Sequence, residues 1–307
     1  MDTFIQLTVN GLTLGSVYAL IALGYSLVYG ILKLLNFAHG DVFMVGTFIG
    51  YGTLQALGGS SHPAVPVWLL LVVLAAAAMA GCAVLGVAIE RFAYRPLRDA
   101  PRIAPLISAL GVSFFLTYSV QLMFGAEQHN YDIFSLDNGS LYLKGFDIGA
   151  VRVPLLRIIT IVSAFALMVV LWLLVTRTRL GKAMRATSYD REAAAMMGIN
   201  VDGVITFTFV LGSALAGAAG VLFALRVPTT ATIGFLAGLK GFTAAVIGGI
   251  GSIPGAMAGG LILGFAESYT EGYVSTRWSD LVVFSILIMF MLLRPQGLLG
   301  RADIRKV

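Results

Sequence analysis

The sequence predicts an all-α, polytopic membrane protein. Only 11% of the 307 residues are charged, against roughly 25% in a soluble domain, while 58% are hydrophobic and 36 more are glycine. So few charges cannot cover the surface of a globule in water. Several apolar runs also approach or exceed the roughly 20 residues that a helix needs to cross a bilayer. These observations exclude most soluble folds.

Seven apolar runs follow one another along the chain and are expected to cross the membrane as helices. They cover residues 12–32, 37–57, 65–89, 103–124, 154–176, 204–225 and 278–293. A further apolar segment, residues 238–265, is interrupted by the sequence GGIGSIPG at residues 248–255, which leaves two pieces that are each short for a crossing. We expect seven spans if this broken segment is re-entrant and nine if both pieces cross, within a single transmembrane domain over residues 1–307.

The positions of Lys and Arg predict the orientation, because short cytoplasmic connections retain positive charge. Thirteen of the 20 basic residues fall in three blocks, at residues 91–102, 177–191 and 294–306, which we expect in the cytoplasm. The connections at residues 125–152 and 267–280 are acid-rich and are expected outside. The N-terminus is therefore expected outside and the C-terminus in the cytoplasm. Basic blocks between apolar runs do not indicate a nucleic-acid surface, despite the net charge of +5.

The sequence lacks the motifs of common hydrolase and ATPase sites. Its only Gly-Lys pair, at residues 181–182, is followed by Ala183 instead of Ser or Thr, so no phosphate-binding loop exists. Neither Gly-x-Ser-x-Gly nor His-Glu-x-x-His occurs. One cysteine and three scattered histidines form no recognisable metal site. We therefore expect neither catalysis nor a cofactor from this chain.

Polar side chains gather at the start of the second apolar run. The sequence Asn36-Phe37-Ala38-His39-Gly40-Asp41 places an amide, an imidazole and a carboxylate there, and polar residues at membrane depth are functional candidates because they are costly. Two interpretations stay open. Asn36 caps the second span while Asp41 favours its helix dipole, or Asn36, His39 and Asp41 line a translocation path or its gate.

The broken segment is a second candidate for the path. A single Gly-x-x-x-Gly pair indicates close helix packing, but the glycines of this segment surround a proline. Broken helices at membrane depth are tolerated where protein or an aqueous path solvates the freed backbone groups. The residues expected to contribute are Gly248, Gly249, Gly251, Pro254 and Gly255. Two charged residues of this region, Lys240 and Glu267, are each expected at a membrane interface, with the lysine snorkelling towards water.

Residues 177–203 form the most informative polar connection. After a basic run, Ser188-Tyr189-Asp190 can begin a helix, the acids Asp190 and Glu192 suit its positive end, and Ala193-Ala194-Ala195-Met196-Met197 favours helix up to Gly198. The exposed face of this helix would be small and smooth, rich in Ala and Met, and suited to a groove on another protein. The alternative is a mere interfacial connector between two spans.

These motifs closely resemble those of the LivH/BraD-type permeases of bacterial high-affinity branched-chain amino acid ABC importers. The resemblance runs from end to end of the chain. It is carried by residues 10–25 (NGLTLGSVYALIALGY), 36–41 (NFAHGD), 90–96 (ERFAYRP), 181–186 (GKAMRA), 198–200 (GIN), 242–256 (FTAAVIGGIGSIPGA) and 294–300 (RPQGLLG).

The resemblance implies the partners of an importer subunit in the bacterial inner membrane. In this family the permease pairs with a second, homologous permease, two cytoplasmic ATPase subunits supply the energy, and a periplasmic binding protein delivers leucine, isoleucine or valine. Residues 177–203 then correspond to the coupling loop that docks on an ATPase, and residues 125–152 to the face that receives the binding protein. The implied coupling positions are Gly181, Arg185, Ala186, Asp190, Glu192, Ala195 and Gly198.

Two alternative functions stay open at this point. Urea and short-amide importers have related permeases that share several of these motifs. A stand-alone secondary transporter or channel would place ionisable residues in mid-membrane for its coupling ions. The ionisable residues here, Asp41, Glu90 and Glu267, are each expected near the end of a span, which favours an ATP-driven importer.

Overall fold

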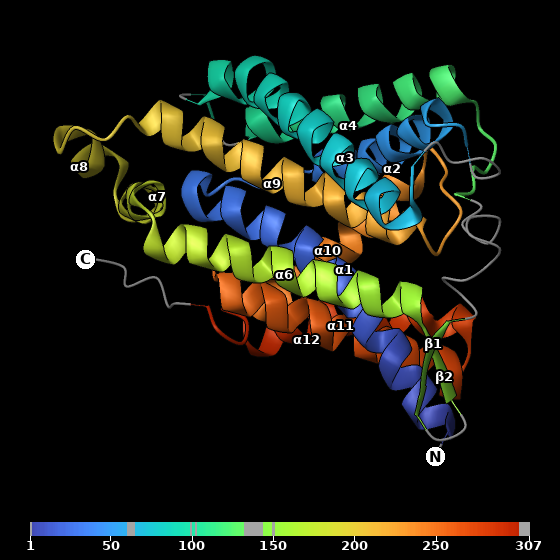
Figure 1. The fold of residues 1–307 in the computed structure, drawn as a ribbon. Helices are drawn as coiled ribbons and strands as arrows, with labels where there is room; N and C mark the ends of the chain where they lie inside the picture. Colours follow the sequence, from blue (N-terminus) through green and yellow to red (C-terminus); the bar gives the residue numbers. More distant parts are fainter. Residues whose placement is uncertain are drawn as a thin grey trace.

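The computed structural model describes residues 2–59, 65–98, 100–101, 103–131, 144–148 and 151–300, and these are almost entirely helical (Figure 1). The all-α, polytopic fold expected from the sequence is confirmed. Nine long helices follow one another in the described part of the chain: α1 (Asp2–Leu32), α2 (His39–Ala56), α3 (Val67–Ile89), α4 (Ile103–Phe124), α6 (Leu155–Arg177), α9 (Val201–Ala224), α10 (Ile233–Gly248), α11 (Ile253–Tyr273) and α12 (Ser279–Leu293).

Six described helices are long and apolar enough to cross a membrane: α1, α3 with the turns that follow it, α4, α6, α9, and α12 with the turn that precedes it. The expectation that both halves of the broken segment are short is wrong for α11, which has 21 residues and is about 30 Å long at 1.5 Å per residue. It continues beyond Phe265 because the charge of Glu267 is paired inside the protein. The count of seven or nine spans stays a prediction.

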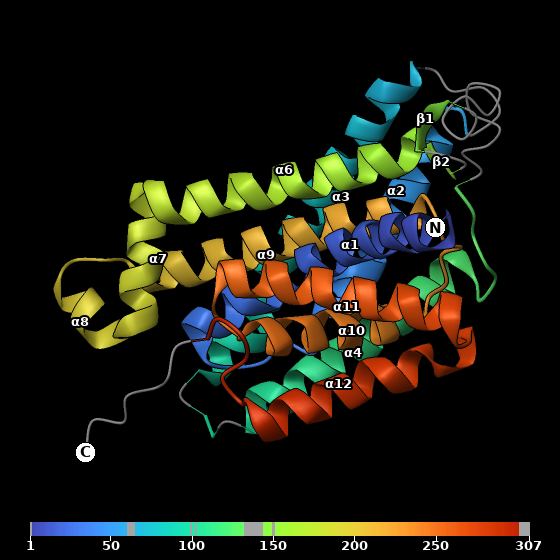
Figure 2. The same cartoon turned by 90° about the horizontal axis from the view of Figure 1, so that it is seen from below.

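Helices α1, α2, α9, α10 and α11 form the interior of the bundle, and α4, α6 and α12 lie around it (Figure 2). Small residues allow the central helices to approach closely. A Cβ atom on Gly15 of α1 would lie 2.9 Å from the Cα atom of Leu261 of α11, and one on Gly11 would lie 3.0 Å from that of Phe265. Such spacing lets helix backbones pack against each other in lipid. The glycine pairs Gly11/Gly15 and Gly260/Gly264 therefore serve helix packing.

The surrounding helices expose apolar side chains. On α4, Phe115 and Leu122 are exposed, as are Trp172 on α6 and Leu292 on α12. In water, an apolar surface of this extent would drive aggregation. It suits the hydrocarbon of a bilayer or another membrane subunit.

Two of the interior helices begin inside the bundle. After α1 ends at Leu32, the chain turns back, so that His39 at the start of α2 packs its ring 4.6 Å from that of Tyr25 in α1. After α9, residues 225–232 turn back in the same way. The start of α10 then meets the start of α2, where a Cβ atom on Gly238 would lie 2.8 Å from the Cα atom of Gly40. Helix α2, which corresponds to the expected second span, therefore begins inside the bundle and is not one of the six helices named above.

The predicted break in the 238–265 segment is confirmed at residues 249–252. Gly249 and Gly251 have φ angles of 101° and 91°, which favour glycine, and the Ser252 hydroxyl accepts a hydrogen bond from the Gly255 N–H at 3.2 Å to cap α11. The last carbonyl groups of α10 accept hydrogen bonds from the N–H groups of Leu298 and Leu299, each at 2.9 Å. The C-terminal turn of the same chain therefore satisfies the backbone groups that the break frees.

Gly249→Ala is expected to lower stability by roughly 1–3 kcal/mol, because the alanine would have to adopt a positive φ. Its Cβ atom would also lie 2.7 Å from the Cα atom of Gly300. The thermal unfolding midpoint in detergent measures the effect. Gly52→Ala in α2 is the matched control, since its Cβ atom would meet nothing within 4 Å. Equal midpoints for the two variants would contradict this account of the break.

The end of the bundle opposite α7 and α8 carries a β-hairpin that the sequence did not suggest (Figure 1). Strand β1 (Gly145–Ile148) pairs antiparallel with β2 (Val151–Pro154). Asp147 and Arg152 form an ion pair at 2.9 Å, and the Arg152 guanidinium lowers the pKa of the Asp147 carboxyl. Half of the acid-rich connection 125–152, namely residues 132–143 and 149–150, lies outside the described residues.

Candidate functional site

The connection between α6 and α9 folds into two short helices that project from one end of the bundle (Figures 1 and 2). Helix α7 (Arg179–Tyr189) is capped by the Thr178 hydroxyl, which accepts a hydrogen bond from the Gly181 N–H at 3.0 Å. Helix α8 (Arg191–Met196) is the short helix expected from the sequence, capped by the Asp190 carboxylate through the Ala193 N–H at 3.0 Å. Helix α7 was not expected, because a basic run resembles a loop in sequence.

The seven expected coupling positions divide into two groups. Five shape the connection. Gly181 lies against the Leu174 and Val175 carbonyls, the Arg185 guanidinium donates a hydrogen bond to the Val175 carbonyl, and Ala186 is half-buried. Asp190 caps α8, and Gly198 ends it with a φ of 80°. The other two, Glu192 and Ala195, are exposed on α8.

Three large apolar side chains complete the exposed surface of this connection. Tyr189, Met196 and Met197 are 86%, 82% and 83% exposed, although they lie in the most polar part of the chain. Exposed apolar side chains clustered in this way mark contact sites for other molecules. The Ala-Met run indicated the two methionines, whereas Tyr189 carried no sequence signal. We call Tyr189, Ala195, Met196 and Met197 the α8 surface.

Arg191 links the connection between α6 and α9 to helix α1. Its Nη2 and Nε atoms donate hydrogen bonds to the Ile31 carbonyl at 2.6 and 3.2 Å. Carbonyl groups in the last turn of a helix have no intrahelical partner and favour a cation. Burial, and then the charge of Arg98, lower the pKa of the Arg191 guanidinium. The start of α8 is therefore hydrogen-bonded to the end of α1. Sequence reasoning placed Arg191 in a basic block and missed this contact.

An ion-pair network joins α3 to α9 at the same end. The Arg98 guanidinium pairs with both Glu90 and Asp202, and Arg95 pairs with Asp202 at 2.8 Å. The Thr206 hydroxyl donates a hydrogen bond to Glu90 at 3.1 Å. The buried Glu90 is thus neutralised within the protein, which suits a structural role.

The residues of the 36–41 sequence lie buried where α2 begins. The Asn36 side-chain oxygen accepts hydrogen bonds from the Ala38 N–H at 3.1 Å and the Tyr94 hydroxyl at 3.2 Å. Ala38, not Asn36, occupies the N-cap position of α2, so the capping interpretation of Asn36 is wrong. Asp41 does lie in the first turn, where it accepts a hydrogen bond from the Thr117 hydroxyl at 3.1 Å.

The two sets of expected path residues lie at different levels of α1. His39 packs against Gly24 and Tyr25. Gly251 belongs to the set from Gly248 to Gly255 and faces Gly30 instead. A Cβ atom placed on Gly30 would lie 3.6 Å from the Cα atom of Gly251. The structure thus separates the sets by about one and a half helical turns along α1. The 36–41 set is enclosed in the bundle, whereas Gly251 and Pro254 are exposed at its end.

Lys240 and Glu267 form a buried ion pair, which corrects their expected placement at membrane interfaces. The Lys240 Nζ atom lies 2.6 Å from Glu267 and 2.8 Å from Asp280 at the start of α12. Both Lys240 and Glu267 are buried, because α10, α11 and α12 enclose them. A charge inside a membrane protein is tolerated when it is paired in this way. Among the described residues, no group of three or more His, Cys, Asp or Glu side chains is placed to hold a metal ion.

Comparison with known proteins shows the family of the chain. The family model described as "Branched-chain amino acid transport system / permease component" matches residues 7–292. The permease protein BraD of the high-affinity branched-chain amino acid transport system of Pseudomonas aeruginosa is 43% identical over 99% of this chain and 98% of its own length. The corresponding LivH protein of Escherichia coli is 42% identical over the same shares.

A more distant relative extends the match. The probable branched-chain amino acid transport permease protein LivH of Methanocaldococcus jannaschii is 28% identical over 92% of this chain and 88% of its own length. No solved structure matches the chain. Both the family model and the first relatives span nearly all of it, including the connection between α6 and α9. The chain is therefore a multi-pass membrane protein that belongs to the family of branched-chain amino acid transport system permease components.

Proposed function

We propose that this protein is the transmembrane permease subunit of an ATP-binding-cassette importer for leucine, isoleucine and valine in a bacterial inner membrane. It forms one half of the translocation path, and a second, homologous permease forms the other. The observation that carries this proposal is the 43% identity to a branched-chain amino acid permease along nearly the whole chain. Because the sequence has no phosphate-binding loop, ATP hydrolysis belongs to two separate cytoplasmic subunits.

The α8 surface is the proposed contact with an ATPase subunit. It projects beyond the bundle (Figure 2) and presents two flexible methionines and a tyrosine, which pack well into a groove on a partner. The basic block around it suits the cytoplasmic side. The coupling positions Gly181, Arg185, Ala186, Asp190, Glu192 and Gly198 give the connection its shape or flank this surface.

We infer that ATP-driven movement reaches the path through Arg191. When the ATPase subunits close, α8 moves as a lever, and the Arg191 guanidinium carries the displacement to the Ile31 carbonyl at the end of α1. The next residues lead back into the bundle to Asn36, His39 and Asp41. A small movement of α1 therefore alters the start of α2, which switches the path between its outward-open and inward-open states.

Asp41 is the proposed contact for the substrate ammonium group. Its carboxylate is buried, and among the described residues it takes part in no ion pair. The adjacent start of α10 offers backbone N–H groups to the substrate carboxylate, as half-helices do in other carriers. The expected path residues between Gly248 and Gly255 contribute to the cytoplasmic end of the path.

Asp41→Asn is expected to reduce amino acid uptake by the reconstituted importer about tenfold or more, because a hydrogen bond between charged groups is lost. Asparagine still accepts a hydrogen bond from Thr117, so folding and ATPase association are expected to persist. Asp2→Asn at the exposed start of α1 removes the same charge elsewhere and is expected to leave uptake unchanged. Full uptake by Asp41→Asn would exclude this role.

Co-purification tests the proposed function against a stand-alone secondary transporter. The tagged chain, expressed with the second permease and the ATPase subunits, is expected to retain both ATPases and to support uptake driven by ATP. Uptake driven by an ion gradient without any ATPase would overturn the proposal. The periplasmic binding protein is expected to bind on the hairpin side of the assembled permeases, at residues 125–152.

A further inference from the structure

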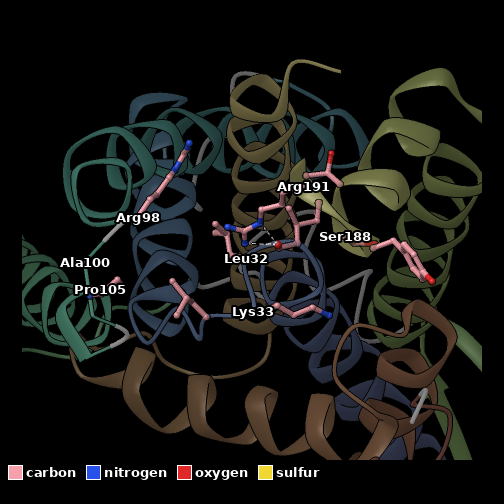
Figure 3. A pocket seen from close by; sticks show the side chains of 11 residues that line it. Leu32, Lys33, Arg98, Ala100, Pro105, Ser188 and Arg191 are labelled. Atoms are coloured by element: carbon pink, nitrogen blue, oxygen red, sulfur yellow. Dashed lines mark hydrogen bonds between the residues drawn. The ribbon is translucent and has the colours of Figure 1, made fainter. Parts of the chain in front are cut away.

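A pocket of about 340 Å³ opens between the end of α1, the start of α4 and the α7–α8 connection (Figure 3). Three basic side chains line it: Lys33, Arg98 and Arg191. Thr187, Ser188 and Tyr189 supply hydroxyl groups, and no carboxylate is found among the described residues that line it. The pocket therefore has the composition of an anion site.

Two of these cations form no ion pair within the described part of the chain. Arg98 pairs with Glu90 and Asp202, but Arg191 uses two of its nitrogens on a neutral carbonyl. Neither Arg191 nor Lys33 forms an ion pair with a described carboxylate. Lys33 lies 6.0 Å from the ring of Tyr29 and has a φ of 56°, a strained conformation for lysine of the sort that persists at functional sites.

Two residues that line the pocket each carry one buried polar atom without a partner in the described part of the chain. These are the Arg98 Nε atom and the Thr187 hydroxyl. Both atoms lie beneath the pocket surface, so the proposed anion site rests on its basic side chains.

We propose that this pocket binds the phosphate group of an anionic phospholipid from the cytoplasmic leaflet. Basic pockets at this membrane face bind anionic head groups. Pro105 in the pocket wall leads into α4, whose exposed Leu106, Ile107 and Leu110 offer an apolar surface for the acyl chains. The proposal rests on the proposed orientation of the chain but not on the identity of its substrate.

A phosphate in this pocket joins three elements that otherwise have few mutual contacts. These are the residue Lys33 after α1, Arg98 before α4 and Arg191 at the start of α8, which all line the pocket. The lipid would thereby hold the α8 surface in place against the bundle before an ATPase docks.

The test titrates the purified complex in detergent with dihexanoyl phosphatidylglycerol and measures binding by native mass spectrometry. Dihexanoyl phosphatidylcholine and inorganic phosphate form two further arms. We expect phosphatidylglycerol to bind more tightly than phosphatidylcholine and more tightly than inorganic phosphate. In Lys33→Asn, we expect affinity to fall about fivefold, since one cation near the membrane surface is lost. Asparagine tolerates the positive φ of residue 33.

Lys182→Gln, which removes an exposed charge of α7 outside the pocket, is the control and is expected to bind like the wild type. If Lys33→Asn does not fold, Lys33→Gly gives the same comparison, since glycine adopts a positive φ without strain. Equal lipid affinity in wild type and variant would overturn the proposal. So would tighter binding of inorganic phosphate than of the lipid, or a loss of ATPase co-purification in the variant with lipid binding unchanged.

Discussion

Replacing Lys240 with methionine is expected to destabilise the protein by about 3–5 kcal/mol, because the substitution leaves a buried carboxylate without its cation. Glu267 is only 4% exposed, and its pairing with Lys240 joins α10 to α11 across the break. Asp280 is half-exposed and is stabilised by water. The loss of stability therefore arises mainly at Glu267. Helix α10 is expected to lose its packing first.

The thermal unfolding midpoint in detergent measures this effect, with expression level as a second indicator. Lys240→Met/Glu267→Leu is expected to recover most of the loss, since it removes both buried charges. Lys182→Met, at an exposed position of α7, is the matched control and is expected to remain within about 0.5 kcal/mol of the wild type. A single variant as stable as the control, or a double variant no better than the single one, would contradict a buried ion pair.

Met196→Asp/Met197→Asp is expected to weaken ATPase association strongly and, with it, to reduce uptake. Both side chains are more than four-fifths exposed, so the aspartates remain solvated in the free chain and folding is preserved. In a docked complex they would lose that water without gaining a partner. A loss of binding of tenfold or more is expected, the size of effect seen when central side chains of an interface are changed.

Co-purification of the ATPase subunits measures this loss. Phe146→Asp, at an exposed apolar position of the hairpin at the other end of the bundle, is the control and is expected to retain the ATPases. Ala195→Arg gives an independent test of the same surface, because Ala195 is exposed whereas Ala194 is buried. Normal ATPase retention by both α8 variants would show that the dock lies elsewhere.

The sequence predicted the helices well because length and hydropathy determine them. The expected span 103–124 has the same bounds as α4, and the expected break is found at Gly249. The composition of residues 188–198 also predicted the short helix α8. Local patterns carry this information, since each helix satisfies its own backbone groups.

Contacts between distant parts of the chain could not be predicted in this way. Lys240 and Glu267 each looked like an interface residue, because the fold that pairs them across 27 positions leaves no local pattern. The contact of Arg191 with the Ile31 carbonyl spans 160 positions and uses a backbone group, which every residue has. The start of α2 inside the bundle depends likewise on where α10 packs.

The measurement that tests the central claim most directly is uptake of labelled leucine by proteoliposomes that contain both permeases and the ATPase subunits, with the binding protein added outside. The proposed function predicts ATP-dependent leucine uptake that disappears when this chain is omitted, and little uptake of labelled urea under the same conditions. Transport of urea without leucine, or leucine uptake that persists without this chain, would contradict it.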